Sequence, residues 1–153
     1  MELTFHTDYA LRTLIYLGLR RGRLCQIAEI AEHYAISRNH LVKVVHHMAR
    51  GGFVATFRGK GGGVSLARDP GAITVGAVVR YTEGPMRLVE CFRAETNECV
   101  ITQGCSLAGI LREAGDNFLA TLDRYTLADL LANRRRLARL LALPDAARGA
   151  SHS

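Results

Sequence analysis

Three of the four cysteines in this 153-residue chain lie close together, at Cys91, Cys99 and Cys105. All three fall within fifteen residues, in the segment CFRAETNECVITQGC. Thiolate sulfur is a soft donor that selects zinc, copper(I) or iron-sulfur clusters over harder metal ions. We therefore interpret this segment as a metal-binding loop, and ask which elements would position it.

The spacing of the three cysteines favours an iron-sulfur cluster. Seven residues separate Cys91 from Cys99 and five separate Cys99 from Cys105, whereas structural zinc sites usually place roughly two to four residues between paired cysteines. A wider loop can wrap a larger object such as a cluster. Three thiolates leave one ligand position, and Cys25, a histidine or a carboxylate are candidates for it. Zinc bound by three cysteines and one histidine stays open, as do three free thiols that are neighbours by coincidence.

Composition and the amino terminus bear on the compartment and the partner. The first residues, MELTFHTDYA, lack the features of a secretory signal, so we expect a cytoplasmic protein in which clustered thiols bind metal or act in redox chemistry. No apolar run approaches the roughly 20 residues needed to cross a bilayer. The 20 Lys and Arg exceed the 14 Asp and Glu and give a net charge of +6, which suits a polyanionic partner.

Two short amphipathic segments, 25–34 and 37–52, predict a helix-turn-helix. Ser37 is the expected N-cap of the second helix, which should end at Gly51 and Gly52. Arginine and asparagine on such a helix can bind guanine and adenine edges in the major groove of DNA. The expected DNA-facing residues are Ser37, Arg38, Asn39, His40, Lys43 and His47. An ordinary helical hairpin with a solvated polar face fits the same two segments.

The next segment predicts a β-hairpin. Two β-prone runs, 53–57 and 64–67, flank the glycine-rich turn RGKGGG. A hairpin directly after a helix-turn-helix is the wing of a winged helix, and Arg58 and Lys60 at its tip suit contacts with phosphate or insertion into the minor groove. We discount a nucleotide-binding phosphate loop, because the glycines lack the required spacing and no Ser or Thr follows the lysine.

Apolar periodicity predicts the helices that flank the winged segment. The first is expected over 6–20, with Thr7 as its N-cap and Asp8 in the first turn, where a carboxylate stabilises the helix dipole. Another is expected over 74–83, with Thr74 as its N-cap.

A long helix and a final helix are expected in the carboxyl-terminal part. Segment 106–127 carries an apolar stripe with coiled-coil-like spacing, which indicates a partner helix from a second copy of the chain. The stripe contains Leu107, Ile110, Leu111, Ala114, Phe118, Leu122 and Tyr125. The final helix is expected over 126–143, and we interpret its arginine run 134–136 as a solvated face.

These elements predict a mainly α fold with a small β-hairpin wing, that is, a winged helix-turn-helix followed by a long dimerisation helix. The expected organisation is a DNA-binding domain over 1–84, a cluster-binding loop over 85–106 and the dimerisation and carboxyl-terminal helices over 107–143. A disordered tail is expected over 144–153, since the segment DAARGASHS has little to bury.

The segment ISRNHLVKVVHHMARGGFVATFRGKGGGVSLA resembles the winged helix of a family of bacterial iron-sulfur repressors, the family of IscR and NsrR. The resemblance extends from Met1 to about residue 143. The portions ECFRAETNECVITQGCSL and FLATLDRYTLADLL are most similar to the nitric-oxide-sensing branch of that family. Cys25 stands where relatives commonly have Thr or Ser at a helix start, and we interpret it as a substitute cap or a small buried residue.

The resemblance implies a site, a partner and a signal. It implies a homodimer with one 4Fe-4S cluster per subunit, 2Fe-2S being the alternative, bound by Cys91, Cys99 and Cys105. The implied fourth ligand is Asp8 from the first helix of the other subunit. The implied DNA partner is a palindromic double-stranded operator, and the implied signal is nitric oxide.

No arrangement of catalytic residues is visible in the sequence. His46 and His47 are adjacent and so lie on different parts of a helix surface, and no HExxH motif, nucleophile elbow or carboxylate pair is present. We therefore do not expect an enzyme, and the resemblance implies a repressor that senses nitric oxide and then releases its operator. The alternatives are a relative that senses iron-sulfur or redox status and a zinc-stabilised DNA-binding protein without a sensing role.

Overall fold

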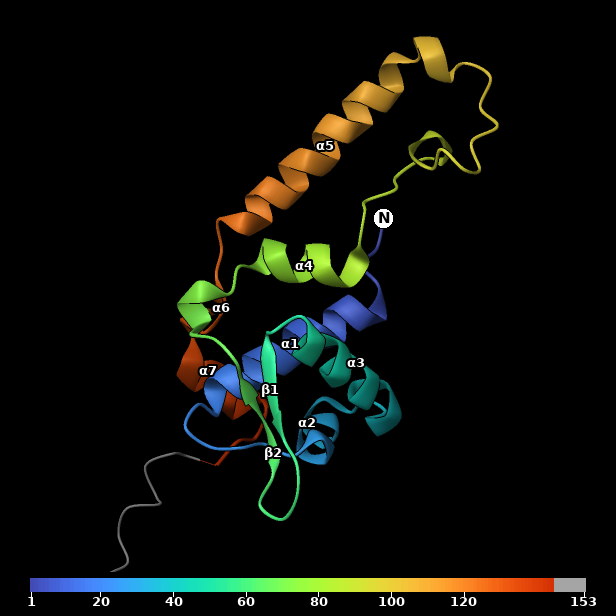
Figure 1. The fold of residues 1–153 in the computed structure, drawn as a ribbon. Helices are drawn as coiled ribbons and strands as arrows, with labels where there is room; N and C mark the ends of the chain where they lie inside the picture. Colours follow the sequence, from blue (N-terminus) through green and yellow to red (C-terminus); the bar gives the residue numbers. More distant parts are fainter. Residues whose placement is uncertain (145–153) are drawn as a thin grey trace, which may run out of the picture.

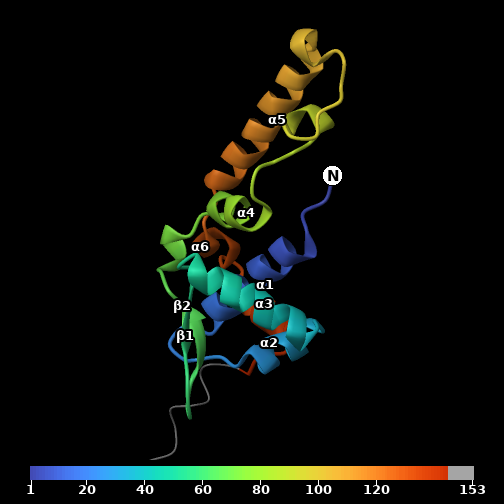
Figure 2. The ribbon, with the colours of Figure 1, turned by 45° about the vertical axis from the view of Figure 1, so that its right-hand side comes forward.

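The computed structural model describes residues 1–144 and is mainly helical, with one two-stranded antiparallel sheet. Its first part contains α1 (Phe5–Leu19), α2 (Ile27–Tyr34), α3 (Arg38–Arg50), β1 (Val54–Phe57), β2 (Gly63–Leu66), η1 (Pro70–Ala72) and α4 (Val75–Glu83). A loop with η2 (Glu90–Phe92) and η3 (Thr102–Gly104) leads to α5 (Ser106–Asp123), α6 (Leu127–Leu130) and α7 (Arg134–Leu140). Figures 1 and 2 both show α5 rising away from the body, which is formed by α1 to α4, the hairpin, α6 and α7, with the loop 85–105 beside α5. The predicted mainly α fold with a hairpin wing is confirmed.

Helix α1 lies at the centre of the body and packs against α3, α4, α6 and β2. Its inward side chains Ala10, Leu14 and Leu17 are at most 2% exposed. The apolar face predicted for α3 is also buried, since Leu41, Val44, Val45 and Met48 are at most 1% exposed. Each fully buried side chain of this kind contributes about 1.5–3 kcal/mol to stability. This packing fixes which face of α3 remains outside.

The prediction that Thr7 caps α1 is wrong. The helix begins at Phe5 because the Thr4 side chain accepts a hydrogen bond from the Thr7 amide at 3.3 Å. Thr7 itself is fully buried, and its hydroxyl donates to Thr82 Oγ1 on α4 at 2.7 Å. Asp8 lies in the first turn, as predicted.

The hairpin is confirmed within a residue, and a segment before α2 also pairs with β2. Strand β1 pairs with β2 in the register Val54–Leu66 to Phe57–Gly63. Cys25 adds an antiparallel bridge to Val64, with backbone hydrogen bonds of 2.9 and 2.8 Å in the two directions. Cys25 therefore precedes α2, where Gln26 occupies the N-cap position. Cys25 is a small buried residue, as one of the two interpretations held, and not a cap.

The single helix predicted over 126–143 is two helices. Thr126 begins α6 with a capping box to Asp129, and the chain turns before α7. The turn lets two groups reach the end of α1: Leu131 packs against Gly18, and Arg134 donates to the Leu19 carbonyl at 2.8 Å. These contacts explain why the periodic pattern does not form one straight helix.

The long helix α5 is confirmed, but it ends at Asp123, so Tyr125 lies beyond it. Among its residues only Gly115 is buried, and Leu107 and Ile110 are 57% and 61% exposed. The tail predicted to be disordered lies, from residue 145 on, outside the described residues. In the described part of the chain, none of the helices has both the length and the apolar character needed to cross a membrane.

Candidate nucleic-acid interface and cysteine loop

A sharp turn between α2 and α3 sets the direction of the expected reading helix. Ala35 adopts the left-handed conformation with φ of 53°, its amide donates to the Glu32 carbonyl, and the Ile36 amide donates to the Ala31 carbonyl. This hydrogen-bond pattern ends α2, and Ile36 is buried as the chain turns. Arg38, Asn39, His40 and Lys43 are exposed on α3, as is Ser37 at its N-cap position. Five of the six predicted α3 contact residues are therefore accessible to a ligand.

His47 does not lie on the exposed face of α3 where it was predicted. Its Nδ1 atom lies 2.7 Å from His6 Nε2, and its ring stacks on Tyr81 with centroids 4.4 Å apart. Burial, together with the nearby His6 and Arg50, lowers the pKa of His47. The error is one of helical phase, because His46 and Arg50 continue the exposed row from Lys43.

Arg58 and Lys60 lie at the exposed tip of the wing, as predicted. Within residues 1–144, neither side chain has a hydrogen-bond or ion-pair partner in the protein. A Cβ atom at Gly62 would lie 2.2 Å from the Phe57 carbonyl oxygen, so the tight turn requires glycine there. The turn thus presents two free cations at its tip.

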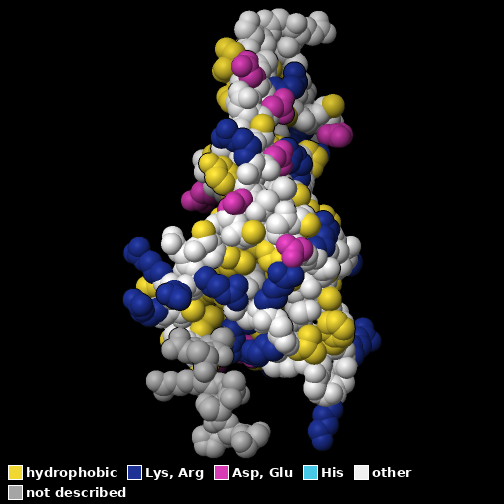
Figure 3. Space-filling model, turned by 90° about the vertical axis from the view of Figure 1, so that its left-hand side faces the viewer, with side chains coloured by type: hydrophobic (Ala, Val, Ile, Leu, Met, Phe, Trp, Pro, Cys, Tyr) yellow, Lys and Arg dark blue, Asp and Glu magenta, His cyan; other side chains and the backbone are white. Residues whose placement is uncertain are grey.

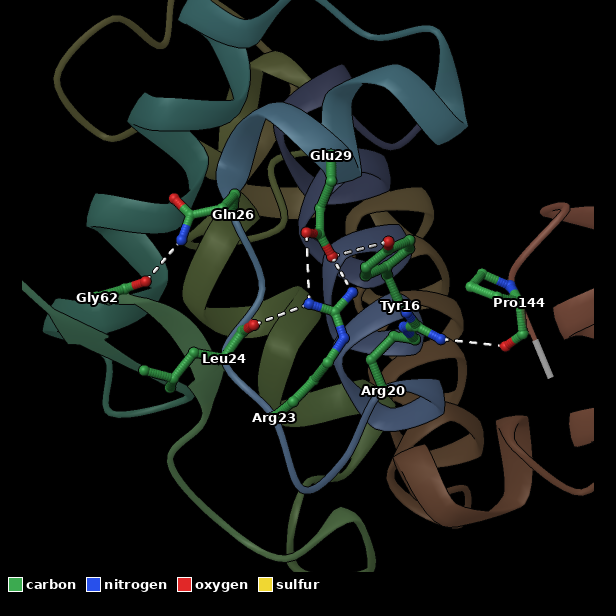
Figure 4. Close-up of polar contacts among 8 residues, drawn as sticks. All are labelled: Tyr16, Arg20, Arg23, Leu24, Gln26, Glu29, Gly62 and Pro144. Atoms are coloured by element: carbon green, nitrogen blue, oxygen red, sulfur yellow. Dashed lines mark hydrogen bonds and ion pairs between the residues drawn. The ribbon is translucent and has the colours of Figure 1, made fainter. Parts of the chain in front are cut away.

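Polar contacts that sequence reasoning missed surround the start of α2, and one of them reaches the wing (Figure 4). Gln26 donates from Nε2 to the Gly62 carbonyl at 2.6 Å, which ties the wing tip to the start of α2. Close by, Glu29 accepts from the buried Tyr16 hydroxyl at 3.0 Å and from the Arg23 guanidinium. Burial opposes ionisation of Glu29, but hydrogen bonds from Arg23, the Gln26 backbone and Tyr16 hold its pKa below the ordinary value. A glutamine at a cap position was the one sequence signal for this role.

Charge is unevenly distributed over the molecule. On the face shown in Figure 3, Lys and Arg side chains gather on the body, whereas most of the visible Asp and Glu side chains lie on the projecting part. Counterion release from DNA favours binding by a surface of this sign. The basic body therefore agrees with the polyanionic partner expected from the net charge.

The cysteine loop carries three free thiols. Cys91 lies in η2, Cys99 precedes η3, and Cys105 occupies the N-cap position of α5. All three side chains are partly exposed. Beside Cys91, a cavity of about 350 Å³ lies between the loop and α5, with Met86, Phe92, Leu111 and Gly115 in its lining.

The donor set fits an iron-sulfur cluster in chemistry, although the ligands are not gathered in the single chain. Three unpaired thiols on one loop can supply three of the four ligands that a cluster requires. In residues 1–144, no three His, Cys, Asp or Glu side chains lie close enough together to bind a metal ion. Asp8 lies on α1 in an ion pair with Arg12 at 2.8 Å, and its side chain is 40% exposed. Cys25 is fully buried beside Val64 of β2 and is not available as a ligand.

Known proteins resemble the chain over nearly its whole length. The family model described as Rrf2, iron-dependent transcriptional regulator, matches residues 3–133. A relative from Bacillus subtilis (strain 168), named HTH-type transcriptional regulator NsrR, is 48% identical over 146 residues, which cover 95% of this chain and 100% of the relative. A relative of the same name from Geobacillus kaustophilus is 49% identical over 142 residues, which cover 92% of this chain and 97% of the relative.

Solved structures agree with these relatives. CymR, described as the global cysteine regulator of B. subtilis, matches with a TM-score of 0.67 and 28% identity, over 87% of this chain and 98% of its own. T. potens IscR matches with a TM-score of 0.69 and 23% identity, over 90% of each chain, and at this identity supports the fold alone. The relatives are named transcriptional regulators, in agreement with the expectation that the chain is not an enzyme. The chain belongs to the Rrf2 family of DNA-binding transcriptional regulators.

Proposed function

We propose that this regulator is a repressor that senses nitric oxide through an iron-sulfur cluster and then releases its operator. One observation carries the proposal: three free, partly exposed thiols share one loop of a chain that also presents a wing and an exposed helix face. Relatives at 48% and 49% identity that are named NsrR support it.

The proposed DNA interface is formed by α3 and the wing. Arg38 and Asn39 are the proposed base readers, since both lie in the exposed first turn of α3 and suit bidentate contacts in the major groove. Ser37, His40 and Lys43 flank them. Arg58 and Lys60 would bind phosphates or enter the minor groove.

The proposed cluster site uses ligands from two copies of the chain. Cys91, Cys99 and Cys105 would hold the cluster, most simply 4Fe-4S, and Asp8 from α1 of a second copy would complete it. When bound, the cluster supplies iron that reacts with nitric oxide. Asp8 is accessible to a partner because its side chain is 40% exposed. A carboxylate oxygen is a harder donor than thiolate and the weaker partner for iron, so Asp8 would be the ligand most readily lost.

A homodimer would couple this release to DNA binding. The apolar stripe on α5 is exposed in the single chain, with Leu107 and Ile110 more than half accessible, and a second α5 would cover it. Release of Asp8 would free α1 of one copy from the loop of the other and change the spacing of the two α3 helices. Operator half-sites must match that spacing by whole helical turns, so affinity for a palindromic operator would fall.

The test is an anaerobic absorption spectrum of the purified protein during stepwise addition of nitric oxide, with iron, sulfide, zinc and operator affinity measured on the same sample. We expect a coloured protein whose spectrum changes with nitric oxide in step with loss of operator binding. A colourless protein that contains stoichiometric zinc after anaerobic reconstitution contradicts the sensing mechanism and leaves the DNA-binding fold intact.

Asp8→Ala tests the fourth ligand, with Glu2→Ala as the control for loss of one acidic group near the amino terminus. Asp8→Ala should retain a cluster with an altered spectrum or an altered nitric oxide response. If both variants match the unchanged protein in spectrum and response, Asp8 is not a ligand.

A further inference from the structure

We propose that His47 is a positioning residue through which α1 and α4 together set the orientation of the reading helix α3. The inference rests on the proposed function, in which Asp8 and the cysteine loop hold the cluster. Its consequence is that a displacement of Asp8 or of the loop changes the DNA interface through the His47 side chain. Within residues 1–144, the hydrogen bonds and ring contacts of His47 are made with His6 and Tyr81.

The first link joins α1 to α3. His6 Nε2 and His47 Nδ1 lie 2.7 Å apart and share a hydrogen bond, with ring centroids 4.9 Å apart. His6 lies two residues before Asp8 in the first turns of α1. Both helices also bury apolar side chains, Leu14 and Val45 among them, in the common core. Apolar packing is non-directional, whereas a hydrogen bond prescribes distance and angle.

The second link joins α4 to α3. The Tyr81 ring stacks on His47 with an interplanar angle of 29°, and the Tyr81 hydroxyl donates to the His47 carbonyl at 2.8 Å. A Cβ atom at Gly51 would lie 2.7 Å from the Tyr81 ring, so this ring lies directly over the end of α3. Tyr81 is three residues before Gly84, where the chain leaves α4 for the cysteine loop.

A third set of contacts joins the start of α1 to the end of α4. The Thr4 amide and hydroxyl donate to Glu83 Oε1 at 2.7 and 2.9 Å. Thr7 and Thr82 are joined by the 2.7 Å hydrogen bond already described. The start of α1, which carries Asp8, and the end of α4, which leads to the cysteines, are therefore clamped together and both contact His47. A displacement of either element changes the position of α3 through the same side chain.

The experiment compares His47→Leu with His46→Leu, the adjacent and exposed control, in full-length protein with and without the reconstituted cluster. The measured quantity is the ratio of operator affinities in the two states. The control changes any DNA contact equally in both states and so leaves the ratio unchanged. His47→Leu should retain the cluster spectrum but reduce the ratio by about fivefold or more, in the range of ordinary coupling between sites. His6→Leu, which alters the partner of the hydrogen bond on α1, should have the same effect.

Two further measurements distinguish the role of His47 from a general effect on folding and from a failure of the proposed function. His47→Gln retains a side-chain hydrogen-bonding group and should recover part of the ratio, which mere loss of packing would not predict. In protein without cluster, His6→Leu should speed amide hydrogen exchange in the last turn of α3, whereas His46→Leu should not. An unchanged ratio in His47→Leu, or unchanged exchange in His6→Leu, overturns the role of His47. A wild-type protein that takes up no cluster overturns the proposed function, and the exchange result then decides whether the link exists.

Discussion

The four cysteines have two different environments. Cys25 is fully buried beside Val64 of β2, and burial, only partly offset by Arg23, raises the pKa of its thiol to about 11. At pH 7.5 about one in three thousand Cys25 side chains would be thiolate, the reactive form. Cys91, Cys99 and Cys105 are partly exposed on the loop.

Alkylation of cluster-free protein should therefore modify three cysteines and spare Cys25. Iodoacetamide at pH 7.5 followed by peptide mass spectrometry measures this directly. Unfolding in guanidinium should expose the fourth thiol, which serves as the internal control. Rapid labelling of Cys25 in folded protein would show that the bridge between residues 25 and 64 opens.

Arg38 and Lys60 should differ in what they contribute to operator binding. Arg38→Ala should cost about 1–3 kcal/mol at one base position and relax the preference there. Lys60→Ala should weaken binding to all sequences and reduce the salt slope by about one. Operator variants titrated at several salt concentrations separate the two, and Arg136→Ala on α7 is a matched control. Equal effects of both changes on every sequence would remove Arg38 from the reading role.

For single residues, the sequence predicted the role of a side chain better than the direction in which the side chain points. Arg38, Asn39 and Lys60 are exposed as expected, because polar residues opposite an apolar helical stripe must face solvent. His47 was predicted on the exposed face of α3, one helical position away from where that face ends. An imidazole is compatible with either side of the boundary between the exposed and the buried face. Thr4 and Thr7 are both good N-caps, and only the hydrogen bonds of Thr7 to α4 decide between them. These hydrogen bonds of Thr7 are tertiary contacts, and a local sequence pattern does not predict them.

Helix α6 depends on a reciprocal cap. Asp129 Oδ2 accepts from the Thr126 amide at 2.7 Å, and the Thr126 hydroxyl accepts from the Asp129 amide at 3.3 Å. The Thr126 hydroxyl also donates to Asp129 Oδ2 at 2.9 Å, and the two hydrogen bonds that this carboxylate accepts, from the Thr126 amide and from the Thr126 hydroxyl, lower its pKa. The folded protein thus binds fewer protons at Asp129 than the unfolded chain does. The stability that the ionised Asp129 carboxyl contributes to the folded protein is complete above the ordinary carboxyl pKa of about 3.9. It is lost as the pH falls through the lower pKa of the folded state.

Thr126→Ala should lower the free energy of unfolding by about 1 kcal/mol, because the Asp129 amide loses its acceptor. Urea denaturation at pH 7 measures the change. Thr121→Ala, on the exposed surface of α5, is the control and should cost less. An effect of Thr126→Ala no larger than that of the control would mean that the bridge from Thr74 to residue 126 alone holds α6.

Whole elements were predictable where one period dominates. The apolar spacing in α3, α4 and α5 predicted each helix closely, and the glycine-rich turn between β-prone runs predicted the wing. The break between α6 and α7 was not predictable, because leucines on both sides keep helical spacing. Its cause is the end of α1, where Leu131 and Arg134 each find a contact. The hydrogen bonds of Gln26 with Gly62 and of Glu29 with Tyr16 join parts of the chain that are distant in sequence, and they were missed for the same reason.

The molecule as a single chain leaves an apolar surface on α5. Ile110→Glu should prevent the proposed dimer from forming, since burying a carboxylate in an apolar seam without a partner is costly. Sedimentation should then show a monomer with unchanged helical content and weaker operator binding. Glu113→Ala, which lies on α5 outside the stripe, should remain dimeric. A dimeric Ile110→Glu would place the subunit contact elsewhere.

Because α4 and α5 cross at Gly76, a small rotation of α5 about this crossing produces a larger displacement at its other end. A Cβ atom at Gly76 would lie 2.9 Å from the Asp123 backbone nitrogen, so the two helices touch at their backbones, and the Arg80–Asp123 ion pair fastens the contact. From that fulcrum α5 extends about 27 Å, and a rotation of about 5° displaces its far end by about 2 Å. Cys105 stands at that far end. Angular changes too small to detect in the body therefore become ångström-scale displacements of a cysteine, which a distance probe attached there would report.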